Sequence, residues 1–282
     1  ISVNELDLRG EGSNYGDITH MADIERAIRN CTGVVHLAAV SRVVWGQRDP
    51  DLCWRTNVTG VQNLAQVALA QKSKPWILFS SSREVYGQAP SLPVEETTPL
   101  NPLNVYARSK SKGERIVMEA CNQGLQTAVV RLSNVYGCTK DHADRVIPAF
   151  AKAAVEGLPL RVEGSNHTFD FTHVDDVVRG INALIDALCS GQKLLPPLHL
   201  VSGRPTSLGE LAALCLRLAK SGAVVTEAAP RSYDVAQFYG DPTRALTVLG
   251  WKSETPLEVG LMRLIDDFKQ ELALHSAVEV AA

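Results

Sequence analysis

The alternation of short apolar runs with amphipathic segments constrains the fold of this chain more than any other feature. Continuous apolar runs of this kind are typical of strands that are buried on both faces of a sheet. They occupy residues 34–39, 76–79, 127–132 and 198–201. Between them, apolar residues recur at helical spacing, as at Val58, Val61 and Leu64. This alternation predicts a parallel sheet with right-handed helical crossovers.

The sequence also predicts two lobes and a short tail. Apolar residues share one face from Val177 to Leu188, behind two aspartates that favour a helix N-terminus, so a helix is expected over 175–188. Residues 139–159 and those after Pro205 show only short helical patterns with Pro and Gly breaks. We therefore expect a larger lobe over 1–138 and 170–203, a smaller lobe over 139–169 and 204–275, and a frayed tail at 276–282.

Composition excludes several classes of partner. The 28 basic and 31 acidic residues nearly cancel and form no Lys/Arg cluster, so nucleic acid is not expected as a partner. No apolar run reaches the roughly 18 residues of a spanning helix, and the N-terminus does not resemble a signal peptide. The six cysteines show no C-x-x-C spacing, which favours a reducing cytoplasm and no metal site.

The strongest chemical signal is the pair Tyr106 and Lys110. Residues four apart lie on the same face of a helix, and a nearby ammonium stabilises a phenolate for acid/base chemistry. The spacing alone is common in surface helices. However, the apolar run 76–79 leads directly into three serines that end at Ser82, where parallel sheets place ligands. The alternative for these serines is a simple turn cap.

A series of ordered motifs extends this signal over most of the chain. They are GDI at 16–18, HLAA at 36–39, NVTG at 57–60, SSSREVYG at 80–87, YARSK at 106–110, RLSNVYG at 131–137 and DFTHVDD at 170–176. Together they resemble the extended short-chain dehydrogenases/reductases, the group of NAD-dependent sugar-nucleotide epimerases, dehydratases and decarboxylases. The resemblance implies a Rossmann-type doubly wound α/β fold with a smaller, mostly C-terminal α/β substrate lobe.

The resemblance also implies catalytic roles. Ser82 would bond the reacting sugar oxygen, and Tyr106 would be the acid/base. Lys110 would tune Tyr106 and bind the nicotinamide ribose. Asn134 would contact the substrate.

The same resemblance implies a set of cofactor contacts. Asp17 and Ile18 would flank the adenine of NAD, while Ala38 and Ala39 would line its diphosphate and ribose. Further cofactor candidates are Asn57 and Ser80. As alternatives, Asp17 is a turn residue, and the two alanines are small core residues.

One departure from the family pattern lies at the N-terminus. The glycine-rich loop that brings backbone amides to the pyrophosphate is absent. We expect that the sequence begins inside the second strand, with the first strand and helix missing. Asp7 would then bond the adenosine ribose and favour NAD over NADP, although Arg9 could accommodate a 2′-phosphate and Asp7 could equally be a solvated loop residue.

A second departure concerns the nucleotide part of the substrate. Many relatives carry an arginine where this chain has Phe169, and an apolar ring cannot pair with a phosphate. Arg231 matches the family's other diphosphate arginine and would bind the nucleotide alone. The alternative is a surface salt bridge.

The reaction depends on the neighbours of Ser82. Family dehydratases carry an Asp-Glu pair there, decarboxylases keep only the Glu, and epimerases more often have small residues. This chain has Arg83, a candidate substrate contact, and Glu84, a candidate catalytic residue. We expect a 4-epimerase of a nucleotide-linked sugar, with a 4,6-dehydratase or sugar-acid decarboxylase as the alternative and a non-catalytic dinucleotide-binding module as the third. A homodimer is expected through the Tyr106 helix and the helix after Asn57.

Overall fold

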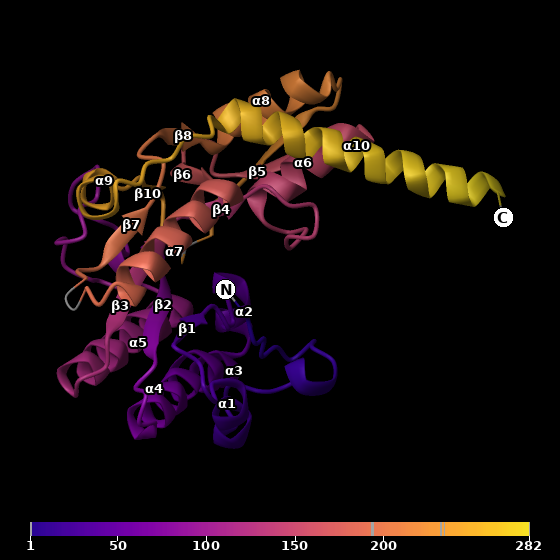
Figure 1. The fold of residues 1–282 in the computed structure, drawn as a ribbon. Coiled ribbons are helices and arrows are strands. Elements are labelled where there is room, and N and C mark those ends of the chain that lie inside the picture. Colours follow the sequence, from indigo (N-terminus) through magenta and orange to yellow (C-terminus); the bar gives the residue numbers. More distant parts are fainter. Residues whose placement is uncertain (1, 193–194, 232, 234, 282) are drawn as a thin grey trace. The chain divides into compact units, whose positions relative to one another are not determined.

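The computed structural model describes residues 2–192, 195–231, 233 and 235–281, the side chains of 275–281 excepted. The chain divides into two compact units (Figure 1). The first consists of Ile1–Ala89, Glu96–Leu132 and Ile181–His199, and the second of Pro90–Glu95, Ser133–Gly180 and Leu200–Ala282.

The first unit contains a four-stranded sheet in the order β1-β2-β3-β7. The strands are β1 (Gly33–His36), β2 (Trp76–Ser82), β3 (Thr127–Leu132) and β7 (Leu198–Leu200). Both β1–β2 and β2–β3 pair in parallel, which confirms the predicted parallel sheet. β1 ends three residues earlier than predicted, because the Asn57 side chain binds both backbone polar groups of Val40 and draws the following loop out of the sheet.

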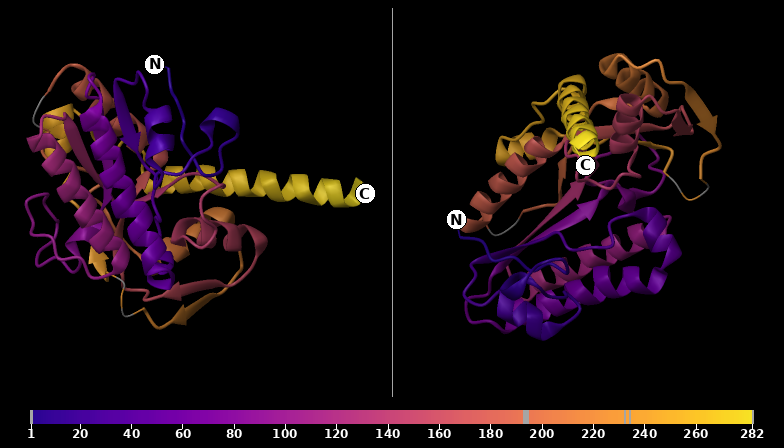
Figure 2. Two further views of the ribbon diagram at one scale, coloured as in Figure 1. Left: turned by 90° about the horizontal axis from the view of Figure 1, so that it is seen from below. Right: turned by 90° about the vertical axis from the view of Figure 1, so that its right-hand side faces the viewer.

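Helices cover one face of this sheet. They are α1 (Met21–Ala27), α4 (Gly60–Ala70) and α5 (Val105–Asn122), and Figure 2 shows α4 and α5 running side by side. Ile24, Leu64 and Val117 pack with Phe79 and Val129 of the strands in one buried cluster. Each such side chain contributes about 1.5–3 kcal/mol on burial, so this cluster holds the helices on the sheet.

Two short helices precede α4. They are α2 (Val43–Arg48) and α3 (Pro50–Trp54), and the latter is capped by Asp49, which accepts the backbone N–H of Leu52. A π-helical turn, η2 (Arg55–Thr59), then leads into α4. Val58, predicted on the α4 pattern, lies in this turn.

The second unit is built around β6 (Thr168–His173). This buried strand lies between β4 (Asn134–Tyr136) and β10 (Gln237–Phe238) and pairs antiparallel with β8 (Pro205–Ser207). A separate parallel pair joins β5 (Leu160–Glu163) to β9 (Val225–Ala228).

These pairings alter the predicted lobe boundaries. Residues 90–95, 133–138, 170–180 and 200–203 were expected in the larger lobe but belong to the second unit. For 133–138 and 170–180 the physical reason is that β4 and β6 pair with each other.

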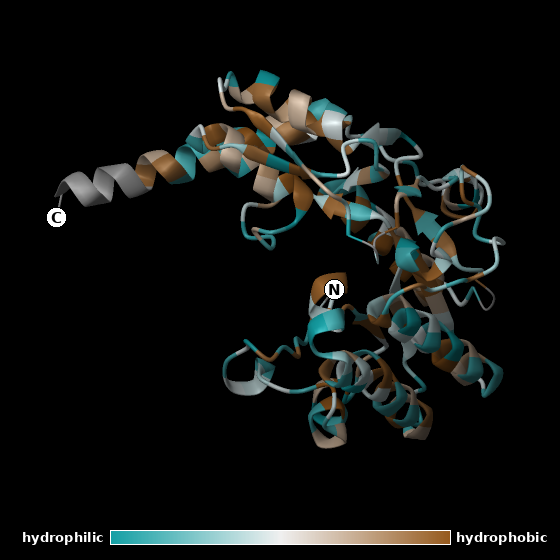
Figure 3. Cartoon of the chain, turned by 180° about the vertical axis from the view of Figure 1, so that it is seen from behind, coloured by the Kyte–Doolittle hydropathy of each residue, from teal (hydrophilic) through white to brown (hydrophobic). Residues whose placement is uncertain are grey.

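The helices of the second unit include α6 (Val146–Glu156), α8 (Leu208–Ala219), α9 (Thr243–Leu249) and α10 (Leu257–Ala281). The described part of α10 alternates between hydrophobic and hydrophilic residues (Figure 3). Its buried residues Leu261, Leu264 and Ile265 explain how one side packs on α6 and α8. The fraying of 276–282 stays a prediction, because side chains from 275 onward lie outside the described residues.

α7 (Val174–Cys189) matches the helix predicted over 175–188 to within one residue at each end. Within the described residues, no helix has both the length and the apolar character that crossing a bilayer requires.

Candidate active site

Ser82 is the last residue of β2 and begins a short 3₁₀ turn, η3 (Arg83–Tyr86). Its Oγ accepts the backbone N–H of Glu84 at 3.2 Å, so the serine does cap a turn. A hydroxyl that accepts one hydrogen bond keeps its own O–H for donation. The turn cap thus fixes the Ser82 side chain and leaves its donor for a ligand.

α5 is capped by Asn104, whose side chain accepts the backbone N–H of Ala107 at 2.8 Å. Asparagine is a favoured N-cap because it satisfies an otherwise unpaired helix donor. The cap places Tyr106 in the first turn and Lys110 one turn later, and both side chains are buried. Tyr106 and Lys110 therefore lie one turn apart on the same helix, as the sequence predicts.

The Lys110 ammonium donates to the backbone oxygen of Ser80 at 2.7 Å. This bond ties α5 to β2 two residues before Ser82. The Lys110 Nζ also lies 5.1 Å from the ring centre of Phe79. Burial lowers the pKa of Lys110 to about 8, against the opposing effects of Cys53 and Glu114. Such a poised buried amine is typical of functional sites.

Glu84 lies beside Ser82 but is held by the protein itself. One carboxylate oxygen lies 3.0 Å from Nη2 of Arg83, and the other accepts Nδ2 of Asn104 at 3.0 Å. Both side chains of the Arg83–Glu84 pair are nearly buried. The charge of Glu84 is therefore balanced inside the fold, which limits its use as a free acid or base.

Asn57 supports the loop after β1 and is completely buried. Its amide binds the backbone of Val40 and donates to Oγ of Ser109 at 2.9 Å. The predicted direct contact with the cofactor stays untested, and the structure gives Asn57 a supporting role for the loop that carries Ala38 and Ala39. Ala38 is exposed and Ala39 half-buried.

The predicted adenine and ribose contacts lie near the N-terminus of the first unit. Asp17 is half-buried, and its carboxylate accepts the N–H of Thr19 at 2.8 Å, as in the turn alternative. Ile18 packs against the main core cluster. Asp7 is exposed, and the backbone N–H of Arg9 lowers its pKa.

Asn134 and Arg231 belong to the second unit, whereas Ser82 belongs to the first. Asn134 is half-buried and opens β4. Nε of Arg231 lies 3.5 Å from a carboxylate oxygen of Glu163, and its guanidinium lies 5.6 Å from the Tyr233 ring. The salt-bridge alternative for Arg231 is thus present in the structure.

Sequence reasoning assigned no role to three supporting features. Asn104 was identifiable as a helix cap two residues before Tyr106. Glu114 continues the i, i+4 series after Lys110, and it forms a buried pair with Arg131. No sequence signal marked Gly46, where an added Cβ would lie 3.3 Å from the backbone nitrogen of Tyr106.

His36, the last residue of β1, is almost fully buried and stacks on Phe79. Its Nε2 has no hydrogen-bond partner among the described residues. Burial, and then the charge of Lys110, lowers the pKa of His36 to about 3. Below pH 6.5 the unfolded chain therefore binds a proton that the folded chain excludes, and stability falls as the pH falls.

We expect His36 to cost about 1.4 kcal/mol of stability per pH unit between pH 6 and 4. His36→Leu should remove this component. Urea denaturation of both proteins at pH 7 and pH 5 measures the difference. Identical losses on acidification in the two proteins would contradict a buried neutral His36.

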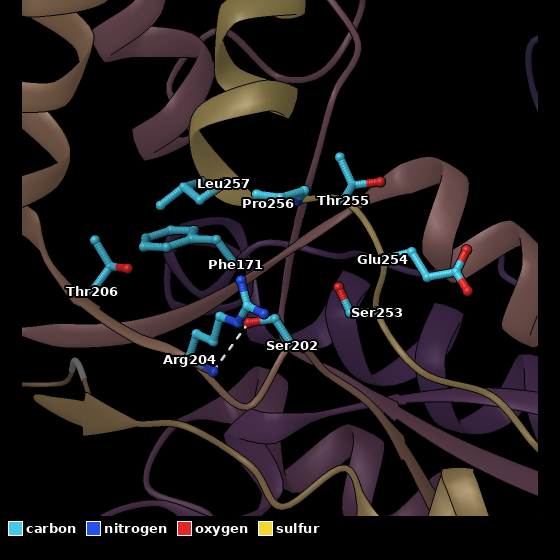
Figure 4. Close-up of a pocket in the computed structure, with 9 residues that line it drawn as sticks. All are labelled: Phe171, Ser202, Arg204, Thr206, Ser253, Glu254, Thr255, Pro256 and Leu257. Carbon is cyan, nitrogen blue, oxygen red and sulfur yellow. Dashed lines mark hydrogen bonds between the residues drawn. The ribbon is translucent and has the colours of Figure 1, made fainter.

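A pocket of the second unit is lined by hydroxyl, charged and apolar groups (Figure 4). Ser202 Oγ accepts the backbone N–H of Arg204 at 3.2 Å at this pocket. None of the predicted site residues lines it, so we assign it no chemistry. Across the described part of the chain, no group of three His, Cys, Asp or Glu side chains is placed to hold a metal ion.

The parallel sheet, the serine at a strand end and the Tyr-Lys pair on the next helix define a short-chain dehydrogenase/reductase. The chain belongs to the NAD dependent epimerase/dehydratase family, which matches residues 3–194.

Similar proteins narrow this class. A UDP-glucose 4-epimerase of Mycolicibacterium smegmatis is 30% identical over 84% of this chain and 76% of its own length. UDP-glucuronate 4-epimerase 4 of Arabidopsis thaliana is 28% identical over 89% of the chain, which spans 61% of that protein. A UDP-glucose 4-epimerase structure from Thermotoga maritima, with UDP-glucose, has a TM-score of 0.84 and 26% identity, covering 94% of this chain and 89% of that one. Similar proteins also include a dTDP-glucose 4,6-dehydratase and a UDP-glucuronic acid decarboxylase.

Proposed function

We propose that the protein is an NAD-dependent 4-epimerase of a nucleotide-linked sugar. The observation that carries this proposal is the arrangement of Ser82, Tyr106 and Lys110 at the end of β2 and the start of α5. Family membership and the similar UDP-sugar epimerases support it. The alternative is a nucleotide-sugar 4,6-dehydratase or sugar-acid decarboxylase.

The residues of the first unit fit NAD. A lysine ammonium has three N–H donors. The Ser80 carbonyl is the only hydrogen-bond partner that Lys110 has within the described residues, so donors remain for ribose hydroxyls. Ala38 is exposed and Ala39 is half-buried, and these small side chains would line the diphosphate and ribose. Asp7, Asp17 and Ile18 would contact the adenosine, and Asn57 would hold the loop.

NAD, when bound, supplies the chemistry of accepting a hydride from the sugar C4 and returning it. Tyr106 takes the proton of the C4 hydroxyl as the carbonyl forms and gives it back when the hydroxyl is restored. Ser82 donates its hydroxyl proton in a hydrogen bond to the same sugar oxygen. Lys110 stabilises the phenolate form of Tyr106, which is present before Tyr106 takes the proton and after it returns the proton. Because the carbonyl is planar, restoration of the hydroxyl from its other face would invert C4.

The second unit would supply the remaining substrate contacts. Asn134 would bind the sugar or its diphosphate, and Arg231 would pair with the diphosphate after leaving Glu163. Arg83 would border the sugar beside Ser82. A homodimer through α4 and α5 and a cytoplasmic location complete the proposal. The six free cysteines are consistent with a reducing compartment.

Glu84 distinguishes the epimerase from its alternatives. A buried carboxylate beside Ser82 favours elimination or decarboxylation, whereas its pairing with Arg83 and Asn104 favours a structural role. We expect Glu84→Gln to keep epimerase turnover within about threefold, because the amide preserves the packing. A dehydratase or decarboxylase would lose about a hundredfold, since an amide cannot transfer the required proton.

The measurement is product analysis of the wild type and Glu84→Gln with NAD and either UDP-glucose or UDP-glucuronate. A C4-inverted product formed at similar rates by both proteins supports the epimerase. Formation of a 4-keto-6-deoxy or a decarboxylated product, lost in the variant, would replace the proposal with its alternative.

A further inference from the structure

The helix that carries Tyr106 and Lys110 is joined to β3, the neighbour of the Ser82 strand, by a buried ion pair that takes no direct part in the proposed chemistry. Glu114 lies one helical turn after Lys110 and two turns after Tyr106, on the same face of α5. Its side chain is 2% exposed. A carboxylate so deeply buried requires full hydrogen bonding, and the structure provides it.

Each oxygen of Glu114 is bonded. One accepts Oγ of Ser81 and Nε of Arg131, the latter at 2.9 Å, and the other accepts Nη2 of Arg131 at 2.7 Å. Ser81 and Arg131 are register partners on the parallel strands β2 and β3. Glu114 therefore fixes α5 to both strands, and a bidentate pair of this kind also fixes orientation.

The attachment points lie directly beside Ser82. Lys110 binds the Ser80 carbonyl and Glu114 binds the Ser81 hydroxyl, so α5 holds the two residues that precede Ser82. After Ser82, Arg131 donates to the Tyr86 hydroxyl at 2.6 Å. The network thus restrains the chain on both sides of the serine.

The Tyr86 end of the network is closed by a second set of buried bonds. Arg131 also donates to the backbone oxygen of Glu96 at 2.9 Å, and the Tyr86 hydroxyl lies 2.6 Å from Nε2 of His199. The backbone N–H of His199 in turn donates to the Glu96 side chain at 2.9 Å. Every guanidinium nitrogen of Arg131 is therefore hydrogen-bonded, which gives Glu114 a rigid partner.

Cys53 and then Glu114 oppose the effect of burial on the pKa of Lys110. The titratable groups around Lys110 are His36 of β1, Cys53 of α3, Tyr106 of α5 and Glu114 itself. Burial lowers the pKa of His36 and raises the pKa of Cys53, so both are neutral near pH 7. The carboxylate of Glu114 raises the pKa of Lys110 and opposes the effect of burial.

We propose that Glu114 is a positioning residue that holds the Tyr106 helix against the Ser82 strand and keeps the Lys110 ammonium charged. This inference rests on the proposed function, because it assigns Lys110 and Tyr106 to catalysis. It adds a residue that contacts neither sugar nor cofactor. Its effect therefore falls on turnover and on the pH profile, not on substrate affinity.

The test compares Glu114→Gln with the wild type in kcat, KM and the pH dependence of kcat/KM. The amide keeps the shape of Glu114 but loses its charge and one acceptor. We expect kcat to fall about tenfold, because small misplacements of reacting groups are costly, while KM for the sugar nucleotide changes less than about twofold. The alkaline limb of the kcat/KM profile should move to lower pH. The reason is that the variant lacks the Glu114 carboxylate, whose charge raises the pKa of Lys110.

Two further variants separate geometry from charge. Ser81→Ala removes the link to β2 and keeps the charge, so we expect a lower kcat with an unmoved alkaline limb. Glu119→Gln makes the same change at an exposed position of α5. It should alter neither kcat nor the alkaline limb of the kcat/KM profile. If Glu114→Gln does not fold, Ser81→Ala alone tests the positioning role.

An unmoved alkaline limb in an active Glu114→Gln protein would overturn the charge role. Unchanged kcat in Ser81→Ala would overturn the positioning role. Failure of the proposed function looks different, because Tyr106→Phe would then keep its turnover whatever happens at Glu114.

Discussion

Tyr106→Phe is expected to lower turnover by about a hundredfold or more and to leave NAD affinity within about threefold. The ring is buried in the first turn of α5, beside α2, so phenylalanine preserves the packing that the tyrosine makes. Only the hydroxyl is lost, and with it the group that takes the proton from the sugar. The measurement is turnover by proton NMR together with calorimetric titration of NAD.

Tyr15→Phe is the matched control, because the same change is made at an exposed tyrosine of the same unit. It should behave as the wild type does. Turnover of Tyr106→Phe close to that of the control would remove Tyr106 from the mechanism and leave a binding module as the better description.

Lys110→Met is expected to lower turnover by at least about a hundredfold and to weaken NAD binding about tenfold. Methionine fills a similar volume in a buried site, so the fold should persist. The variant lacks the ammonium that stabilises the Tyr106 phenolate, and the Ser80 carbonyl loses its donor. Weaker NAD binding follows from the loss of the donors assigned to the ribose.

The pH dependence of kcat/KM in the wild type should show whether activity requires the charged form of Lys110. Burial lowers the pKa of Lys110 to about 8, so the ammonium is present below that pH and is lost above it. We expect kcat/KM to decline above about pH 8. Lys112→Met, on the same helix, serves as the control. It should retain both the turnover of the wild type and the decline of kcat/KM above about pH 8. Normal NAD binding and turnover in Lys110→Met would contradict its role.

The parallel sheet and the placement of Tyr106 and Lys110 followed from the sequence, because each depends on local periodicity. Buried strands appear as apolar runs, and the four-residue spacing fixes a shared helix face. The α7 helix was predicted for the same reason. These features need no knowledge of distant partners.

Other features depend on contacts between distant residues. β1 ends at His36 because Asn57, 17 residues after Val40, captures the backbone of that residue. The unit boundary depends on the pairing of β4 with β6. The pairing of Glu84 with Asn104 joins residues 20 apart. Sequence patterns report periodicity along the chain and carry no direct record of such pairings.

The Glu114–Arg131 pair illustrates the same limit at the site. In the sequence, Glu114 is a polar residue in a predicted helix, and Arg131 is a charged residue in an apolar strand. Only their 2.7 Å approach shows that each neutralises the other in the interior. A charge in a buried strand is itself a signal, since it predicts an opposite charge from another element.

The most direct test of the proposed function is a proton NMR time course. The protein, expressed from its complete coding sequence, is incubated with NAD and separately with UDP-glucose and UDP-glucuronate. We expect one of these sugars to become inverted at C4 with no net reduction of NAD. Accumulation of a 4-keto-6-deoxy or decarboxylated sugar, or an unchanged spectrum with every sugar offered, would contradict the 4-epimerase proposed for this chain.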